Sequence, residues 1–490
     1  MISAGERTGV RTSAVGGTAH TGRSWRDFSL LLAVGLAFAD ASIVVLALPQ
    51  IVGELHTSIS HVTWVIMVYN LALIAGVLVF LTTAGQRLES RRALLAGLGL
   101  FGVASLGSGG AGSLGVLLAM RGVQGAGGAL LLCASLPLLT GASSPGESST
   151  AAWAKAAAVG AAIGPALGGV LTELFDWRAI FLAQAPAAAL AAAAVLAAHV
   201  PSPRAVVAKT RVRAALDPLT ANVALLLLSA GLIGALFLVV VLLIDVWQLA
   251  PIAAAAVVSA IPLTTVLVER IARAANATRL GAVGAVLLAL GLVAIAFVSH
   301  RELGWAIIAL ALCGAGLGLA FTSLSDAALG GAGSATARAG RTVAARDAGL
   351  VVGLLILTPI FVHDLNAAPK RAIPAITKEV VGAPVPTATK LELGNELLKT
   401  YRETPQGRLP DLGPPFARVR AHAKPASAGA LTTLQNQLQS TIERAVTRSF
   451  RRALLYSAVL ALLVLPVLGL RLAYVRLQRA SATYSSGRDP

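Results

Sequence analysis

The chain has 490 residues, of which 56% are hydrophobic and only 12% are charged. Water-soluble globular proteins carry about 25% charged residues, so this composition excludes a chain whose whole surface faces water. The net charge of +17 lies in short clusters between apolar runs, which argues against a single nucleic-acid-binding face. Lipid must therefore cover part of the surface, and we expect a membrane protein.

Residues 1–27 are polar, and we expect them to form a cytoplasmic tail. The apolar run that follows is too long for the hydrophobic region of a cleavable signal peptide. A helix needs about 20 apolar residues to cross a bilayer, and twelve runs meet this requirement. They lie near residues 28–52, 62–84, 93–111, 114–140, 151–174, 179–199, 221–247, 251–269, 280–299, 304–324, 342–362 and 453–475.

The spacing of these runs divides the chain into two halves. The first half covers 28–199, a basic linker covers 200–220, and the second half covers 221–475. A second cytoplasmic tail, 476–490, follows the last span. The sequence therefore predicts an all-α, polytopic fold with about 12 transmembrane helices in two six-helix halves.

Basic residues indicate the orientation, because short cytoplasmic loops are enriched in lysine and arginine. The short outer loops hold only Arg178 and Arg301. The inner loops hold many more, namely Arg87, Arg91, Arg92, Arg204, Lys209, Arg211, Arg213, Arg270, Arg273, Arg279, Arg338, Arg341 and Arg346. We therefore expect both termini in the cytoplasm and the spans in the inner (cell) membrane. Arg451 and Arg452 oppose this rule, because they flank the last span on its outer side.

A long outer segment, 363–450, interrupts the second half before its last span. It mixes proline-rich stretches with two helix-like stretches, near Lys390–Arg402 and from Leu431 to Val446. The second stretch has apolar residues at helical spacing and would extend the last span outward. Two interpretations stay open at this point: a partly ordered cap over the outer mouth, or a flexible linker.

Two opposite charges lie inside apolar runs, Asp40 in the first and Arg121 in the fourth. A charge at the centre of a span costs about 2.5–3.5 kcal/mol on insertion scales, so both should face the protein interior or a wet cavity. Pairing would offset part of their desolvation. One hypothesis is that Asp40 carries protons across the membrane, and the alternative is a static ion pair. We expect Asp326 and Asp347, at the ends of an inner loop, to be solvated.

Glycine recurs every fourth residue in the fifth run, at Gly160, Gly164 and Gly168, with Pro165 and Gly169 beside them. This spacing puts the first three on one helix face, where a neighbouring helix can pack closely. Pro165 removes a backbone hydrogen bond and bends the helix. The pattern predicts either a hinge between two conformations or ordinary close packing.

Three sequence patterns now point to a family. They are DASIVVLALP at 40–49, RGVQG at 121–125 and GAAIGPALGG at 160–169. They resemble motifs of the drug:proton antiporter branch of the major facilitator superfamily, D-x-T-I-V-N-V-A-L-P, R-x-x-Q-G and G-x-x-x-G-P-x-x-G-G. The resemblance covers 28–200. It departs in loop 83–95, which keeps Arg91 and Arg92 but lacks the aspartate of the branch's gating loop, and in having 12 spans where the branch usually has 14.

The resemblance implies a secondary transporter that works by alternating access between its two halves. Asp40 would titrate protons with Arg121 as partner or relay, and the glycines with Pro165 would shape the interface. Arg91 and Arg92 would belong to the gate. Asn70 and Gln124 would contact a substrate in the cavity, or else act as helix-packing polar residues. The branch implies export of lipophilic, often cationic, small molecules.

The expected partners are the lipid bilayer, a small lipophilic substrate and protons, with no nucleic acid, no metal and no cofactor. We expect a monomer. A non-transporting scaffold or sensor of the same fold is the competing hypothesis. An enzyme is not expected, because the sequence shows no nucleophile–base set and no phosphate-binding glycine loop.

Overall fold

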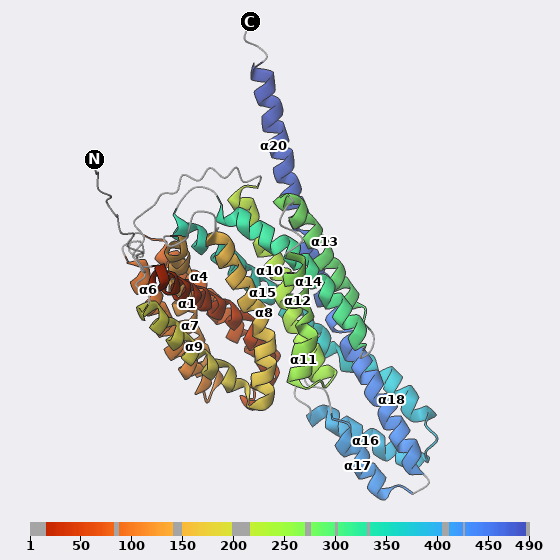
Figure 1. The fold of residues 1–490 in the computed structure, drawn as a ribbon. Helices are drawn as coiled ribbons and strands as arrows, with labels where there is room; N and C mark the ends of the chain where they lie inside the picture. Colours follow the sequence, from red (N-terminus) through yellow and green to blue (C-terminus); the bar gives the residue numbers. More distant parts are fainter. Residues whose placement is uncertain are drawn as a thin grey trace, which may run out of the picture.

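The computed structural model describes residues 16–82, 88–140, 149–197, 216–269, 276–298, 302–330, 334–403, 411–424 and 427–486. Long helices lie side by side in a bundle, and a smaller group of helices projects from one end of it (Figure 1). Among the described residues there is no strand, and twelve helical stretches are long and apolar enough to cross a membrane. The predicted all-α polytopic fold with about 12 spans is confirmed.

The first six spans are made by helices whose bounds follow the predicted runs. They are α1 (Gly16–Ile43) continued by η1 (Val44–Ala47) and α2 (Leu48–Glu54), the short α3 (Ile59–Val62) with α4 (Trp64–Phe80), α6 (Ser90–Gly109), α7 (Leu114–Thr140), α8 (Ser149–Leu174) and α9 (Trp177–Ala197). The linker 200–215 and loop residues 83–87 lie outside the described residues.

The second six spans follow with the same alternation of long helices and short connections. They are α10 (Pro218–Val241) continued by η2 (Leu242–Val246), α11 (Pro251–Val258) with α12 (Ala260–Glu269), α13 (Ala277–Ala296), α14 (Leu303–Leu329), α15 (Ala335–Gly382), and α19 (Phe450–Leu462) with α20 (Val464–Ser486).

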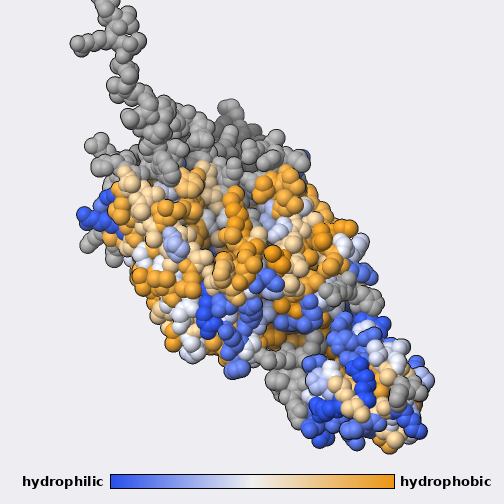
Figure 2. All heavy atoms as spheres, turned by 60° about the horizontal axis from the view of Figure 1, so that its bottom comes forward, coloured by the Kyte–Doolittle hydropathy of each residue, from blue (hydrophilic) through white to orange (hydrophobic). Residues whose placement is uncertain are grey.

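The outside of the bundle is apolar. Large side chains such as Leu78, Val79 and Val103 are mostly exposed, and Figure 2 shows apolar residues covering much of the visible bundle surface, in contrast to the more polar projecting group. Water-soluble proteins rarely expose contiguous apolar surface on this scale. The chain is therefore a multi-pass membrane protein.

Close glycine contacts hold matching helix pairs together in both halves. In α8, a Cβ atom added at Gly164 would overlap Ser42 of α1, and in α15 one added at Gly349 would overlap the Leu226 carbonyl of α10. The pairs α1–α8 and α10–α15 are the first and fifth spans of their halves. Helix association in lipid depends on such close approach, so the two halves are built by the same packing rule.

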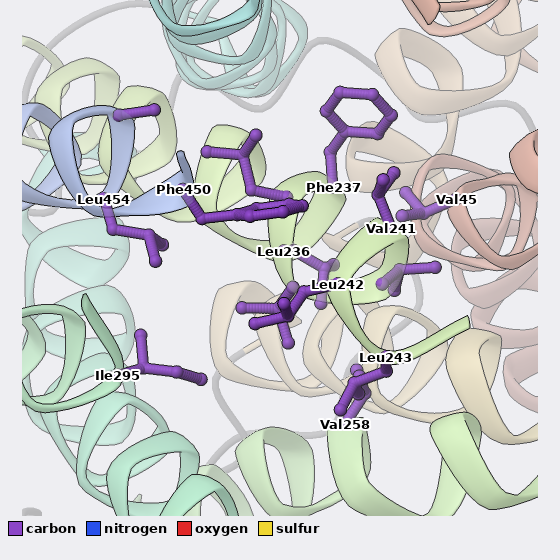
Figure 3. Packing of buried hydrophobic residues seen from close by; sticks show 14 of the residues in the cluster. Val45, Leu236, Phe237, Val241, Leu242, Leu243, Val258, Ile295, Phe450 and Leu454 are labelled. Atoms are coloured by element: carbon purple, nitrogen blue, oxygen red, sulfur yellow. The ribbon is translucent and has the colours of Figure 1, made fainter. Parts of the chain in front are cut away.

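An apolar seal joins the halves near the end that carries the projecting helices. Figure 3 shows Val45 of η1 beside Val241 of α10, with Leu236, Phe237 and Leu242 in the same cluster. These side chains are buried. Close-packed apolar residues exclude water, so this end of the bundle is closed between the halves.

The projecting helices, named here the outer extension, consist of the end of α15 together with α16 (Thr387–Glu403), α17 (Gly413–His422) and α18 (Ala428–Thr447). The start of segment 363–450 is more helical than its prolines indicated, because α15 runs to Gly382 through Pro369 and Pro374. Each proline removes one backbone hydrogen bond, and packing of α15 against α18 compensates. The helix-like stretch from Leu431 to Val446 is indeed helical and lies in α18.

The base of the outer extension contains the arginines that opposed the charge rule. Arg452 lies 3.2 Å from the buried carboxylate of Asp364, and Arg371 lies 3.3 Å from the same oxygen. Arg451 stacks over Phe297, 4.7 Å from the ring centroid. These arginines are retained at this end because each has a partner there.

Substituting Gly349 by alanine should lower the thermal midpoint of the purified protein in detergent, because the new Cβ meets the backbone of α10. The cost should be about 1–3 kcal/mol, as for other overpacked sites. The matched control is Gly99→Ala in α6, where nothing lies within 4 Å of the added atom and alanine favours the helix. Equal midpoints for the two variants would contradict the close α10–α15 contact.

Candidate functional site

Asp40 and Arg121 form a sealed ion pair in the first half. Nη1 of Arg121 donates to both carboxylate oxygens of Asp40 at 2.8 Å, and both side chains are 0% exposed. Nε of Arg121 donates to the Val65 carbonyl at 3.0 Å. The pairing predicted from the two intramembrane charges is present, and it connects α1, α4 and α7.

A polar network extends from this pair. Nη1 of Arg121 also donates to Gln124, at 2.6 Å. The amide nitrogen of Gln124 in turn contacts Ser105 of α6 at 2.9 Å and Gln184 of α9 at 2.8 Å. The Tyr69 ring lies under the guanidinium, 4.3 Å from its centroid. Five helices of the first half therefore converge on one buried charge pair.

Some polar atoms of this network have no hydrogen-bond partner, namely Nη2 of Arg121 and Nε2 of Gln184. Leaving a buried donor unpaired costs about 1–3 kcal/mol or more for a charged group. The network is therefore not fully satisfied in this conformation. Such a site can gain hydrogen bonds when the charge on Asp40 or the positions of the helices change.

A cavity lies between the two halves, beside this network. Its wall takes Phe38, Ser42 and Pro165 from the first half, and Leu225 and Phe321 from the second. The cavity volume is about 170 Å³, which is enough for a group about the size of an aromatic ring. Asp40 does not line the cavity, although its neighbours Phe38 and Ala41 do.

The charge in the cavity wall is the opposite of the one expected. Among the described lining residues, Arg346 of α15 carries the only charge. Its Cζ lies 4.2 Å from the ring centroid of Phe38 in α1 and 5.7 Å from that of Phe321 in α14. The assignments of Arg346 to an inner loop and of Asp347 to solvent are wrong. The helix begins at Ala335, and Asp347 is only 4% exposed.

The glycines of α8 lie at contacts with two neighbours. Added Cβ atoms at Gly160 and Gly164 would overlap α1, and one at Gly168 would lie 2.7 Å from the Ile43 carbonyl. Gly169 faces the other half, where an added Cβ would lie 2.8 Å from the Pro251 carbonyl of α11. Close packing is thus present, and Gly169 lies at the contact between the halves.

The remaining predicted residues lie apart from the cavity. Asn70 donates to the Ile66 carbonyl at 2.8 Å, and neither Asn70 nor Gln124 lines the cavity. Arg91 reaches the Leu196 carbonyl at 3.4 Å, and Arg92 pairs with Glu89 at 3.2 Å. These contacts of the arginines stay within the first half.

Four residues of the buried network or the cavity wall escaped the sequence reasoning: Tyr69, Ser105, Gln184 and Arg346. Gln184 is an amide inside an apolar run, and this signal resembles the one that identified Asp40. Tyr69 and Ser105 are too common in spans to stand out. Arg346 precedes the most apolar part of its span, so a hydropathy count places it in the loop.

The chain is similar in sequence to known proteins. The sequence model of the Major Facilitator Superfamily matches residues 30–357. The lincomycin resistance protein of Streptomyces lincolnensis is 33% identical over 189 residues, which are 38% of this chain and 39% of the relative. The multidrug efflux pump LfrA of Mycolicibacterium smegmatis is 32% identical over 168 residues, 34% of this chain and 33% of the relative. The matches thus span well under half of either relative.

A solved structure shares the fold over nearly the whole chain. It is a bacterial homologue of the human lysosomal transporter Spinster, in an inward-facing, unoccupied conformation. The TM-score is 0.59, the identity is 15%, and the match covers 91% of this chain and 98% of that one. At this identity the likeness shows the fold alone.

Replacing Asp40 by asparagine should destabilise the protein by about 3–5 kcal/mol, because the guanidinium of Arg121 loses its buried counter-charge. The double variant Asp40→Asn/Arg121→Gln should recover much of this loss. Thermal unfolding of the wild type, the two single variants Asp40→Asn and Arg121→Gln, and the double variant forms a double-mutant cycle. Glu396→Gln, which breaks the partly exposed Arg418 pair of the outer extension, should cost less than about 1 kcal/mol. Additive effects at Asp40 and Arg121 would contradict a coupled pair.

Proposed function

Because the chain belongs to the Major Facilitator Superfamily, we propose that it is a secondary active transporter that exports lipophilic small molecules in exchange for protons. The two halves would rock about the cavity between them. The observation that carries the proposal is the buried Asp40–Arg121 pair, which adjoins the wall of that cavity. The family and the drug-exporting relatives support a transporter and not an enzyme.

Asp40 is the proposed proton carrier. Protonation would remove its charge and weaken both 2.8 Å contacts to Arg121, because charge-assisted hydrogen bonds are about twice as strong as neutral ones. Arg121 would then donate to other acceptors, and the contacts among the five helices that converge on the pair would change. Proton binding would in this way alter the packing of the first half.

The proposed orientation puts both chain ends in the cytoplasm of the cell and the outer extension outside. Helix α20 ends at the side of the bundle opposite the outer extension (Figure 1). In this orientation the apolar seal closes the outer side, so the state is inward-facing. We further propose that a single chain is sufficient, since each half completes the cavity wall of the other.

The competing proposal, a scaffold or sensor without transport, has one observation in its favour. Loop 83–95 lacks the gating aspartate, and the described contacts of Arg91 and Arg92 do not reach the second half. A transporter with an altered gate accounts for the same contacts and also for the cavity. Transport is therefore the preferred function.

Wild-type protein in proteoliposomes should move members of a panel of lipophilic fluorescent compounds when a pH gradient is imposed. Asp40→Asn should reduce this flux to the level of protein-free vesicles, while exchange of the same compound without a gradient persists. Asp245→Asn, at a half-exposed carboxylate at the end of another span, is the control and should retain gradient-driven flux. Equal flux in wild type and Asp40→Asn would rule out the coupling role. No gradient-dependent flux of any compound would favour the scaffold.

Orientation is tested by labelling single cysteines in intact cells with a membrane-impermeant maleimide. Lys399→Cys, on the exposed surface of α16, should react, whereas Arg92→Cys, 79% exposed at the other end, should react only after permeabilisation. The native Cys133 and Cys313 are buried, so their background should be low. The reverse pattern would place the outer extension in the cytoplasm.

A further inference from the structure

The cavity wall combines aromatic and aliphatic side chains with a single cation. Phe38, Trp153 and Phe321 supply aromatic surface, and Arg346 supplies the only charge among the described lining residues. Ser325 and Thr342 lie in the same wall, and the Thr342 hydroxyl is buried without a hydrogen-bond partner. Apolar walls with a few fixed polar groups are typical of ligand sites, and here the fixed charge is positive.

The guanidinium of Arg346 is held by aromatic rings and not by a carboxylate. It stacks at 4.2 Å from the Phe38 centroid, across the boundary between the halves. No ion pair within 4.0 Å involves Arg346 among the described residues. Stacking covers the flat face of a guanidinium, and its edge N–H groups remain free for a planar anion.

No aspartate or glutamate belongs to the cavity wall among the described lining residues. Asp347 attracts Arg346 electrostatically but is not part of the cavity wall. Asp40 is 0% exposed and already bound to Arg121. A cation in an apolar cavity is costly unless an anion joins it. The site therefore favours a negatively charged guest and repels a positively charged one.

We propose that the transported substrates are amphipathic anions, with a carboxylate, sulfonate or phosphate group at Arg346 and an apolar body against Phe38, Trp153 and Phe321. This inference rests on the proposed transport function and names its substrate class. It reverses the cationic preference that the first-span acidic motif implies. The oxygen atoms of the anion accept hydrogen bonds from the N–H groups at the edge of the Arg346 guanidinium.

The test uses two probes of matched size, 1-naphthylacetate and 1-naphthylmethylamine, with purified full-length protein in nanodiscs and equilibrium dialysis. The anion should bind at least about tenfold more tightly than the amine, the scale of one charge-assisted hydrogen bond. Arg346→Gln should abolish the preference. Arg346→Lys should restore part of it, since it keeps the charge but loses the planar edge. Arg341→Gln, exposed on the same helix outside the cavity, should match the wild type.

Equal binding of the two probes to the wild type, or tighter binding of the amine, would overturn the proposal. This result does not depend on the stability of the variants. Retention of the anion preference in a folded Arg346→Gln protein would also overturn it. Gradient-driven flux of the probes in proteoliposomes separates this proposal from the transport function. If the protein binds the anion more tightly but shows no gradient-driven flux, the anion-binding proposal is supported and the transport proposal is rejected. If the amine is transported and Arg346→Gln does not change that flux, the transport proposal is supported and the anion-binding proposal is rejected.

Discussion

A single buried ion pair organises the first half of this protein. Neither Asp40 nor Arg121 touches water, and lipid cannot stabilise either charge, so each depends on the other and on the surrounding amides and hydroxyls. The helices that supply those groups must stay in register to keep the pair intact. The same dependence makes the pair sensitive, because neutralising one member alters the balance of forces on every helix that contacts it. The stability of the first half and the proposed response to protons would therefore depend on the same interaction.

The cavity-lining charge of the second half, Arg346, has different surroundings. Arg346 stacks on aromatic rings and borders open space, whereas Arg121 is fully enclosed. The two halves share their glycine-mediated packing, as at Gly164 and Gly349, but they have diverged in polar content. The first half holds a closed acid–base pair, and the second presents a cation to the cavity. The same helix packing thus holds a buried ion pair in the first half and a cavity-lining cation in the second.

The environment of a residue could be predicted from the sequence where that residue type is rare in its surroundings. Asp40 and Arg121 stand out in apolar runs, and the four-residue glycine spacing indicated a closely packed neighbouring helix, which the structure shows to be α1. The environment could not be predicted where it depends on the position of a residue within a long helix. Arg346 and Asp347 were assigned to a loop because hydropathy does not show that α15 begins at Ala335. Prolines 369 and 374 indicated irregular chain, but α18, far along the sequence, supplies the packing that keeps α15 helical.

The length of α15 has a mechanical consequence. Its 48 residues correspond to about 72 Å at the usual rise per residue, of which about 30 Å would suffice for the hydrocarbon core. The remainder of the helix projects as a lever arm. It packs against α18, and an ion pair between Asp364 and Arg452 lies at its base. Any tilt of the second half is magnified at the tip in proportion to that arm. A load on the tip, such as attachment to a fixed surface, would therefore resist any such tilt.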